Sequence, residues 1–453
     1  MFKNTPKAVL FVFILSMSLR LVLAFLNRDA NDNHMEVINW IVDKHELPEK
    51  NDCGQCYHLK LFYVLSAGII KSFHITSEDS RIVSIQLFNV VLGFLTLLFF
   101  WKFIKKYPAN KNIKIITFAF FAFNPCLAGI NVQVTNDTLV ILSGVLTVYF
   151  ADMLLNDLRV KYALGLMIFL IIAAMTKATG LVLFAIVSIV FILKILSKSS
   201  EKKRKVLLKY FLTIFFVFIS IVPFAGGYYT YYKKYKSLPT SMWGYDPHPK
   251  FFESTFTNRP GIRNIAEGFF TFQYLDMIRQ PYINNESDNF PLHRTSLWSQ
   301  LYGRTVFMHF DQWPGSWQTT SPLIINVGRV LIIIGIIPLL LFLLGLFKGL
   351  SRALKRFFKK GISSLSKSND YIHLIVTVVF LLCSIKYSYS IRDFSAMKSI
   401  YIFPGFISYI KLFLDKFSSI QSQKTIKIIS MILIIMVLLS IYDIGYLTYQ
   451  LGK

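Results

Sequence analysis

Long runs of apolar residues are the feature that most constrains how this chain folds. About 20 consecutive apolar residues suffice to cross the hydrocarbon core of a bilayer as one helix. Such runs predict eleven membrane-spanning helices, at 8–26, 82–101, 113–133, 138–155, 162–176, 179–197, 206–229, 322–346, 371–388, 397–414 and 428–448. The chain is 54% hydrophobic, above the usual share in soluble domains. We therefore expect an all-α polytopic membrane protein whose first helix is retained rather than cleaved as a signal peptide.

Short basic tracts between these runs predict the orientation in the membrane. The chain has 49 Lys and Arg against 24 Asp and Glu, a net charge of +25. Lys and Arg resist translocation, so they mark the cytoplasmic ends of helices. The tracts follow alternate helices, near 102–106, 159–161, 198–205, 348–360 and 416–427. This pattern predicts a cytoplasmic amino terminus for a protein of the cell membrane. It also accounts for the net charge by membrane topology, so the charge does not indicate binding of nucleic acid.

Loops on the predicted outer face divide the chain into three parts. An amino-terminal membrane module, 1–232, carries a long first outer loop at 27–81. Within that loop the run at 57–73 is apolar but short and contains two Lys, so we expect an interfacial or re-entrant helix there. Residues 233–321, with seven Pro and four Trp, are predicted to form a small external domain. Residues 322–453 form the carboxyl-terminal membrane module.

The first outer loop holds the densest acidic cluster of the chain. A helix starting near Asn31 would place Asp32 and Glu36 one turn apart, with Asp32 close to the helix amino terminus. A carboxylate held there lies within reach of a substrate arriving from lipid or from water. Asp29 and His34 flank the same position, and His34 and Glu36 are possible contacts to a sugar or an acceptor. Helix capping, together with the ordinary acidic bias of an outer loop, is the structural explanation that the spacing alone favours.

Charged residues also occur at three tight outer connections. Asp137 lies between two apolar helices, where an ionisable group is costly and marks a functional site by default, although capping of the next helix is the alternative. Lys177 is either a snorkelling side chain or part of an anion site. Arg392, Lys398 and Tyr401 offer three donors suited to a phosphate oxygen, or else belong to an aromatic belt with snorkelling cations.

Two further clusters on the outer face have structural alternatives. Cys53 and Cys56 are followed by His58. One such pair lacks the four ligands usual for structural zinc, and a disulfide is permitted outside the cell, so a disulfide is expected and a divalent metal is the second interpretation. In the external segment Arg304 and His309 are candidates to face a sugar or an acceptor, with a structural cluster of aromatic residues and salt bridges as the alternative.

Taken together, these features resemble the GT-C superfamily of polyprenyl-phosphate-sugar-dependent glycosyltransferases. Within it they are similar to the protein-mannosyltransferase-like branch, glycosyltransferase family 39, which includes the lipid A aminoarabinose transferases. Five segments in order carry the resemblance: NDNHMEVINWIVDKHELP, CYHLKLFYVLSAGI, NPCLAGINVQVTNDTLVIL, MTKATGLVLF and MKSIYIFPGF. The chain departs from the branch in two places. Its first-loop acids are spread where many members carry adjacent Asp-Glu, and Leu59 and Lys60 stand where Pro is common.

The resemblance implies transfer of a sugar from a polyprenyl phosphate to a hydroxyl of a protein, lipid or glycan acceptor. Transfer would occur on the outer face of the membrane, with inversion at the anomeric carbon and without a catalytic metal or other cofactor. A carboxylate must accept the proton of the acceptor, for which Asp32 is the expected base and Asp29 the reserve. Asp137 would orient the acceptor or assist the base. The departing phosphate needs positive or hydrogen-bonding groups, for which the candidates are Lys177, Arg392, Lys398 and Tyr401.

Two other function classes fit part of the pattern. A transporter or lipid flippase is also polytopic, but its polar residues usually meet near the midplane between two related halves. Here the polar candidates gather at the outer ends of helices. An O-antigen ligase or polymerase would take a lipid diphosphate donor and depend on Arg and His in a late outer loop. Transfer of a labelled sugar by the purified protein separates the enzyme from the transporter.

Overall fold

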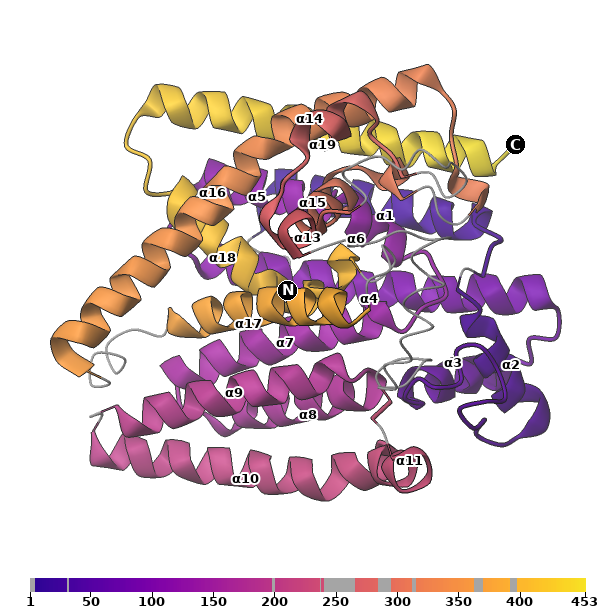
Figure 1. Cartoon of the computed structure of the whole chain (residues 1–453), viewed down its shortest axis with the longest axis horizontal. Coiled ribbons are helices and arrows are strands. Elements are labelled where there is room, and N and C mark those ends of the chain that lie inside the picture. Colours follow the sequence, from indigo (N-terminus) through magenta and orange to yellow (C-terminus); the bar gives the residue numbers. More distant parts are fainter. Residues whose placement is uncertain are drawn as a thin grey trace.

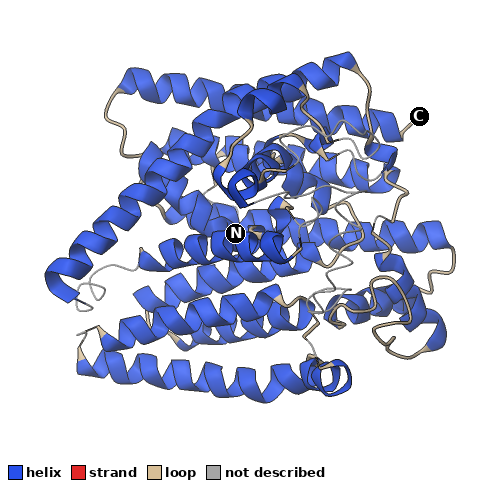
Figure 2. Cartoon of the chain, in the orientation of Figure 1, coloured by secondary structure: helices blue, strands red, loops and turns tan. Residues whose placement is uncertain are grey.

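The fold is a bundle of helices. The computed structural model describes residues 5–30, 32–197, 200–236, 238–239, 265–283, 295–311, 315–361, 370–391 and 397–453, and within them it contains helices and no strands (Figure 2). In the same part of the chain eight helices are long and apolar enough to span a membrane: α1 (Lys7–Leu26), α4 (Glu78–Lys106), α7 (Asp137–Asn156), α9 (Thr179–Leu196), α10 (Glu201–Ala225), α16 (Pro322–Lys360), α17 (Tyr371–Ser390) and α19 (Gln423–Leu451). The apolar α8 (Val160–Thr176) is slightly shorter. The predicted all-α polytopic membrane architecture is confirmed.

The basic tracts share one end of the bundle. In Figure 1 the carboxyl ends of α9, α16 and α18 (Phe406–Phe417) and the amino ends of α10, α17 and α19 lie on the left. The helices of the first outer loop, α2 (His34–Lys44) and α3 (Leu61–Ser72), lie on the right. The short α11 (Tyr228–Tyr235) is seen end-on there and so runs across the direction of α10. The acidic first loop is therefore at the end of the bundle opposite the basic connections.

The first outer loop is folded as two short helices against α4. Ile38 of α2 and Phe62 of α3 are fully buried in one apolar cluster with Ile85 of α4. Arg81 of α4 contacts the carboxylate of Asp43 in α2 at 3.0 Å. The helix α3 corresponds to the short interfacial run that the sequence predicts at 57–73. These contacts fix the acidic loop to the bundle.

The predicted span 113–133 is two helices in the structure. α5 (Lys111–Ala122) ends before Asn124, and α6 (Pro125–Ile130) starts at a proline. Proline lacks the amide that continues a helix, and its fixed φ suits a first turn. The side chain of Asn124 caps α6 by accepting a hydrogen bond from the Leu127 amide at 2.9 Å. The prediction of one continuous helix was wrong here because hydropathy does not register this break.

Arg20 of α1 supplies partners at the break. Its guanidinium is 1% exposed and donates to the Ala122 carbonyl at 2.9 Å, to the Asn131 Oδ1 at 3.1 Å and to the Ser16 carbonyl at 3.1 Å. A helix end inside a membrane leaves carbonyls without partners in the helix, and a buried cation needs hydrogen bonds to offset its desolvation. The guanidinium of Arg20 donates to the carbonyl left free at the helix end, and that carbonyl is in turn one of the partners that the buried cation requires. Arg20 thereby ties α1 to the connection that leads into α7.

The predicted span 397–414 also begins without an α-helix. It starts in the short 3-10 turns η6 (Ser399–Tyr401) and η7 (Phe403–Gly405), and α18 follows. These turns pack closely on α7, because a β-carbon added to Gly144 would lie 2.5 Å from the Cβ of Pro404. The residues just before the turns and within them thus remain on irregular backbone.

The described parts of the predicted external segment from residue 265 onward include short helices, of which α14 (Tyr274–Arg279) and α15 (Leu297–Val306) contact α16. The other short elements are α13 (Ile265–Phe270) and the 3-10 turns η2 (Met308–Phe310) and η3 (Gly315–Trp317). Met277 and Leu301 share an apolar cluster with Ile324 of α16. The indole of Trp317 donates to the Asn27 Oδ1 at the end of α1, at 3.3 Å. This segment therefore reaches across to the first outer loop.

We expect Gly144→Ala to destabilise the protein because the added methyl group would overlap Pro404. Overpacking of this kind costs about 1–3 kcal/mol. Gly68→Ala in α3 is the matched control, since nothing lies within 4 Å of its added β-carbon and alanine favours the helix. Thermal unfolding in detergent measures both variants. Equal melting temperatures for the two would contradict the close packing of α7 on η7.

Candidate active site

Asp137 forms a buried ion pair at the start of α7. Its Oδ1 accepts a hydrogen bond from the Lys177 Nζ at 2.5 Å, and the two side chains are only 9% and 16% exposed. Its Oδ2 accepts one from the Thr135 hydroxyl at 3.2 Å. A carboxylate in the first turn is also stabilised by the helix dipole. The preceding Asn136 makes no side-chain capping bond, so the ion pair rather than capping determines how Asp137 is held.

Lys177 lies in the tight turn between α8 and α9. The turn depends on Gly180, whose added β-carbon would collide with the backbone of Ala173 and Ala174. The Lys177 Nζ lies 5.2 Å from the centroid of the Tyr401 ring, within the range of a cation–π contact. The irregular segment before α18 is thereby brought onto the Asp137–Lys177 pair.

Asp32 lies in a left-handed turn before α2. The φ angles of Asp32 and Asn33 are +25° and +57°, in a region that Asp and Asn enter more readily than most residues. Because α2 begins at His34, the expected helix from Asn31 with Asp32 and Glu36 one turn apart was wrong. Asn31 itself lies outside the described residues. The turn, not a helical face, orients the Asp32 carboxylate.

The three acidic residues of the first-loop cluster, Asp29, Asp32 and Glu36, have different surroundings. The Asp32 Oδ2 lies 3.6 Å from the Nζ of Lys398, which precedes η6. The other two carboxylates accept hydrogen bonds from the external segment and from the loop itself, namely Ser316 Oγ to Asp29 Oδ2 at 3.2 Å and Gly54 N to Glu36 Oε2 at 3.2 Å. Of these three carboxylates, Asp32 is therefore the one that lies beside Lys398.

Lys398 interacts electrostatically with the carboxylates of both Asp–Lys pairs and with charged residues of the external segment. The carboxylate of Asp32 raises the pKa of Lys398 against the opposing effect of burial. Asp311 and Asp137 act in the same direction, and Arg304 opposes them. Arg304 is itself ion-paired with Asp311 and buried on α15. The predicted candidate Arg304 thus lies close to the site, with its charge compensated.

His34 lies among all four charged groups of the two pairs. Its imidazole is 4% exposed, its Nδ1 is 2.7 Å from the Tyr63 hydroxyl, and its ring stacks on that of His58 at 5.6 Å between centroids. Burial lowers the pKa of His34 to about 4. The carboxylates of Asp32 and Asp137 oppose this shift, and the two lysines reinforce it. His34 is accordingly neutral near pH 7.

Two tyrosines complete the polar surface. Burial raises the pKa of Tyr57 and of Tyr401, and Tyr387 and both carboxylates, Asp32 and Asp137, act in the same direction. Both phenols therefore stay protonated and can donate hydrogen bonds. Sequence reasoning selected Tyr401 but missed Tyr57. The only signal for Tyr57 was its place directly after the Cys-x-x-Cys pair.

Cys53 and Cys56 form a disulfide, with 5.1 Å between their Cα atoms. The Cys56 carbonyl also accepts a hydrogen bond from the Lys60 Nζ at 2.6 Å. Tyr57 and His58 follow this closed loop and contribute to the site described above. As a disulfide, neither sulfur is a thiolate ligand for zinc. Within the described ranges no three His, Cys, Asp or Glu side chains form a group suited to a metal ion.

One predicted candidate, His309, is not part of this cluster. His309 is 1% exposed, and its Nδ1 lies 2.6 Å from the Asp443 Oδ1 of α19. The Met308 amide donates to the same carboxylate at 2.9 Å, so this pair fastens η2 to the last helix. Arg392, the remaining candidate for phosphate binding, lies outside the described residues.

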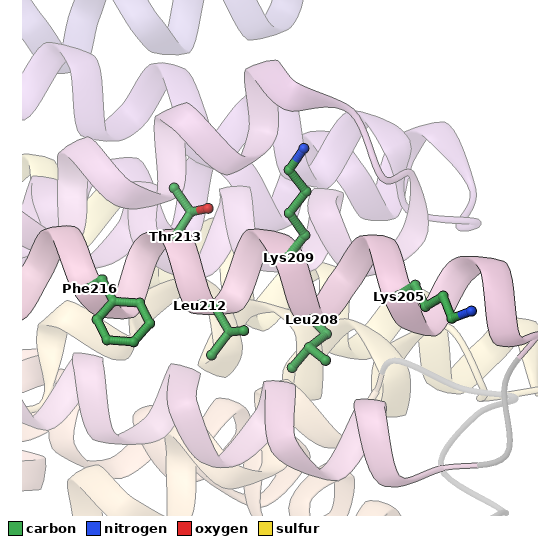
Figure 3. A pocket seen from close by; sticks show the side chains of 6 residues that line it. All are labelled: Lys205, Leu208, Lys209, Leu212, Thr213 and Phe216. Atoms are coloured by element: carbon green, nitrogen blue, oxygen red, sulfur yellow. The ribbon is translucent and has the colours of Figure 1, made fainter.

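A shallow depression on α10 is separate from these residues. It has a volume of about 390 Å³ and is lined by Lys205, Leu208, Lys209, Leu212, Thr213 and Phe216. Figure 3 shows that all six side chains come from one stretch of helix. The lining has no carboxylate, imidazole or thiol for acid–base chemistry, and it lies near the basic end of α10. We therefore assign the candidate active site to the Asp32 and Asp137 cluster.

We expect the stability of the protein to fall as the pH is lowered from 6.5 toward 4. In this interval an unfolded histidine, with an ordinary pKa of 6.5, binds a proton that folded His34, with its pKa of about 4, does not. The stability present above pH 6.5 is thus lost on acidification, by about 2–3 kcal/mol at pH 4.5. Thermal unfolding of the wild type and of His34→Gln in detergent at pH 7.5 and 4.5 measures the difference.

His58 provides a second variant for the same measurement, because burial holds its pKa well below the ordinary value. His58→Gln and His34→Gln should each reduce the loss of stability between pH 7.5 and 4.5, and the double variant should reduce it further. An unchanged loss in all three variants would show that other groups cause the pH dependence.

Comparison with known proteins relates this geometry to a family. Residues 66–224 match the family model of dolichyl-phosphate-mannose-protein mannosyltransferases. The apo crystal structure of an Archaeoglobus fulgidus oligosaccharyltransferase aligns with 100% of this chain and 57% of its own, at a TM-score of 0.50 and 11% identity. The chain thus spans little more than half the length of that protein. No curated protein matches the chain in sequence.

A second solved structure is more distant. ArnT from Cupriavidus metallidurans, bound to undecaprenyl phosphate, aligns over 92% of this chain and 78% of its own, at a TM-score of 0.36 and 11% identity. The segment matched by the mannosyltransferase model contains Asp137 and Lys177, at the start of α7 and after α8. The family match and the fold shared with the archaeal enzyme confirm the predicted resemblance: this chain is a membrane protein that shares the fold of that enzyme, and its residues 66–224 match the mannosyltransferase family model.

Proposed function

We propose that this protein transfers a sugar from a polyprenyl phosphate to a hydroxyl acceptor on the outer face of the membrane, with inversion. The observation that carries the proposal is the meeting of two Asp–Lys pairs, Asp32–Lys398 and Asp137–Lys177, from four separate segments of the chain. Sugar transfer from a lipid phosphate needs a base for the acceptor and cations for the leaving group. The cluster contains both kinds of group side by side.

Asp32 suits the role of general base. Its side chain is 42% exposed, and its contact with the Lys398 Nζ is 3.6 Å long, so an acceptor hydroxyl can approach the carboxylate. Asp137 is 9% exposed and already holds Lys177 and Thr135. We assign Asp137 to the orientation of Lys177 and of the acceptor. Asp29, bonded to the external segment, is not needed in this scheme.

The lysines and Tyr401 suit the phosphate. As the acceptor oxygen attacks the anomeric carbon, its proton passes to Asp32 and the bond from that carbon to the phosphate oxygen breaks. The electron pair of this bond leaves with the polyprenyl phosphate, whose negative charge increases by one. Lys177, Lys398 and the protonated phenol of Tyr401 would stabilise that charge. Attack from the face opposite the phosphate inverts the anomeric carbon. No step in this scheme uses a metal.

We expect Asp32→Asn to lower kcat for sugar transfer by at least about 100-fold, because an amide cannot accept the acceptor proton. Asp29→Asn is the matched control in the same loop and should retain most of the activity. The assay is transfer of labelled sugar from polyprenyl phosphate by the purified protein in detergent. Full transfer by both variants would refute the assignment of the base. Saturable flux in proteoliposomes without transfer would favour a transporter.

We expect Lys398→Gln to weaken binding of sugar-free polyprenyl phosphate about 10-fold or more, because the variant loses a charge-assisted hydrogen bond to the phosphate. Lys60→Gln is the control, because the Lys60 ammonium already donates a hydrogen bond to the Cys56 carbonyl within the first loop. Product inhibition of the transfer reaction measures the binding. Equal inhibition constants for Lys398→Gln and the wild type would remove Lys398 from the phosphate site.

A further inference from the structure

Among the residues that the structure describes, one ring nitrogen of His34 has no hydrogen-bond partner. Its Nδ1 is paired with the Tyr63 hydroxyl at 2.7 Å, and no described residue hydrogen-bonds its Nε2. The His34 residue is only 4% exposed. An enclosed ring nitrogen that lacks a protein partner favours a ligand able to complete its hydrogen bond.

The position of His34 relative to the reacting groups is specific. The carboxylates of Asp32 and Asp137 and the ammonium groups of both lysines all act on its imidazole. In a displacement at the anomeric carbon, the sugar ring lies between the attacking oxygen at the base and the departing phosphate at the cations. A group that neighbours both the base and the cations thus borders the space of the sugar ring.

The chemistry of Nε2 limits what it binds. Each carboxylate of the cluster already has a lysine, so the site offers His34 no additional charge to balance. A neutral imidazole whose Nδ1 is engaged presents Nε2 as a single donor or acceptor. The stacked rings of His58 and Tyr63, at 5.6 and 5.8 Å, hold its plane in place. Such a fixed and neutral group suits an uncharged hydroxyl.

We propose that the His34 Nε2 hydrogen-bonds one hydroxyl of the transferred sugar and makes His34 a residue that determines sugar specificity. The inference rests on the proposed transferase function and deepens it. The transferred sugar is then one with a hydroxyl at that position, and its 
deoxy analogue is a poor donor. A site built to bond a hydroxyl rejects the analogue that lacks it, because the buried polar group is left without a partner.

The test compares deoxy donors in three forms of the protein. A panel of hexosyl and pentosyl polyprenyl phosphates first identifies the transferred sugar, and each hydroxyl of that sugar is then replaced by hydrogen in turn. For the wild type we expect one position at which the replacement lowers kcat/KM about 10-fold or more. In His34→Phe, which keeps a ring but has no nitrogen, the loss at that position should shrink to about 2-fold or less. Losses at the other positions should not change.

His34→Gln serves as the conservative variant, because its amide can replace Nε2. It should restore part of the discrimination at the same hydroxyl. Inhibition by sugar-free polyprenyl phosphate should be equal in all three proteins, which shows that each variant is folded and binds the lipid. Equal deoxy losses in the wild type and in His34→Phe would overturn the role of His34 alone. A wild type that transfers no sugar from any donor would overturn the proposed function and this inference with it.

Discussion

Charges enclosed in a membrane bundle must be paired or fully hydrogen-bonded, and the rest of this structure depends on that requirement. Arg20 is stable inside the bundle because carbonyl and amide oxygens accept hydrogen bonds from its guanidinium. Those oxygens come partly from the break between α5 and α6. The cation and the break therefore support each other, and the connection that leads to Asp137 is fixed by α1 rather than by its own helix propensity.

Broken helices also explain why the candidate site lies at one end of the bundle. A continuous helix over 113–133 or over 397–414 would carry its polar residues through the hydrocarbon region. The structure instead has short irregular segments before α7 and before η6, and these carry Thr135 and Lys398. Irregular backbone at membrane depth is tolerated where protein surrounds it. Gly144 and Gly180 permit the close packing on which these segments depend.

The class of fold and several residues of the candidate site could be predicted from the sequence. The features that depend on the local path of the backbone could not. Hydropathy predicted the long spans, because length and composition alone determine them. A charged residue at the end of an apolar helix is easily recognised in a sequence, and this signal identified Asp137, Lys177 and Lys398. Tyr57 was missed since only the turn after the disulfide brings it to the carboxylates. The left-handed turn at Asp32 was missed because periodicity assumes a helix, while a local turn needs only Asp and Asn that tolerate positive φ.

The two ion pairs differ in a way that suits the proposed reaction. Asp137 and Lys177 are close and largely buried, whereas Asp32 and Lys398 are farther apart and more exposed. When the proposed base takes a proton, Asp32 loses one negative charge and the departing phosphate gains one. Lys398 then has no carboxylate to hold and a phosphate nearby to bind. The looser pair can exchange one anion for another at constant net charge, while the tighter pair keeps Lys177 in position throughout.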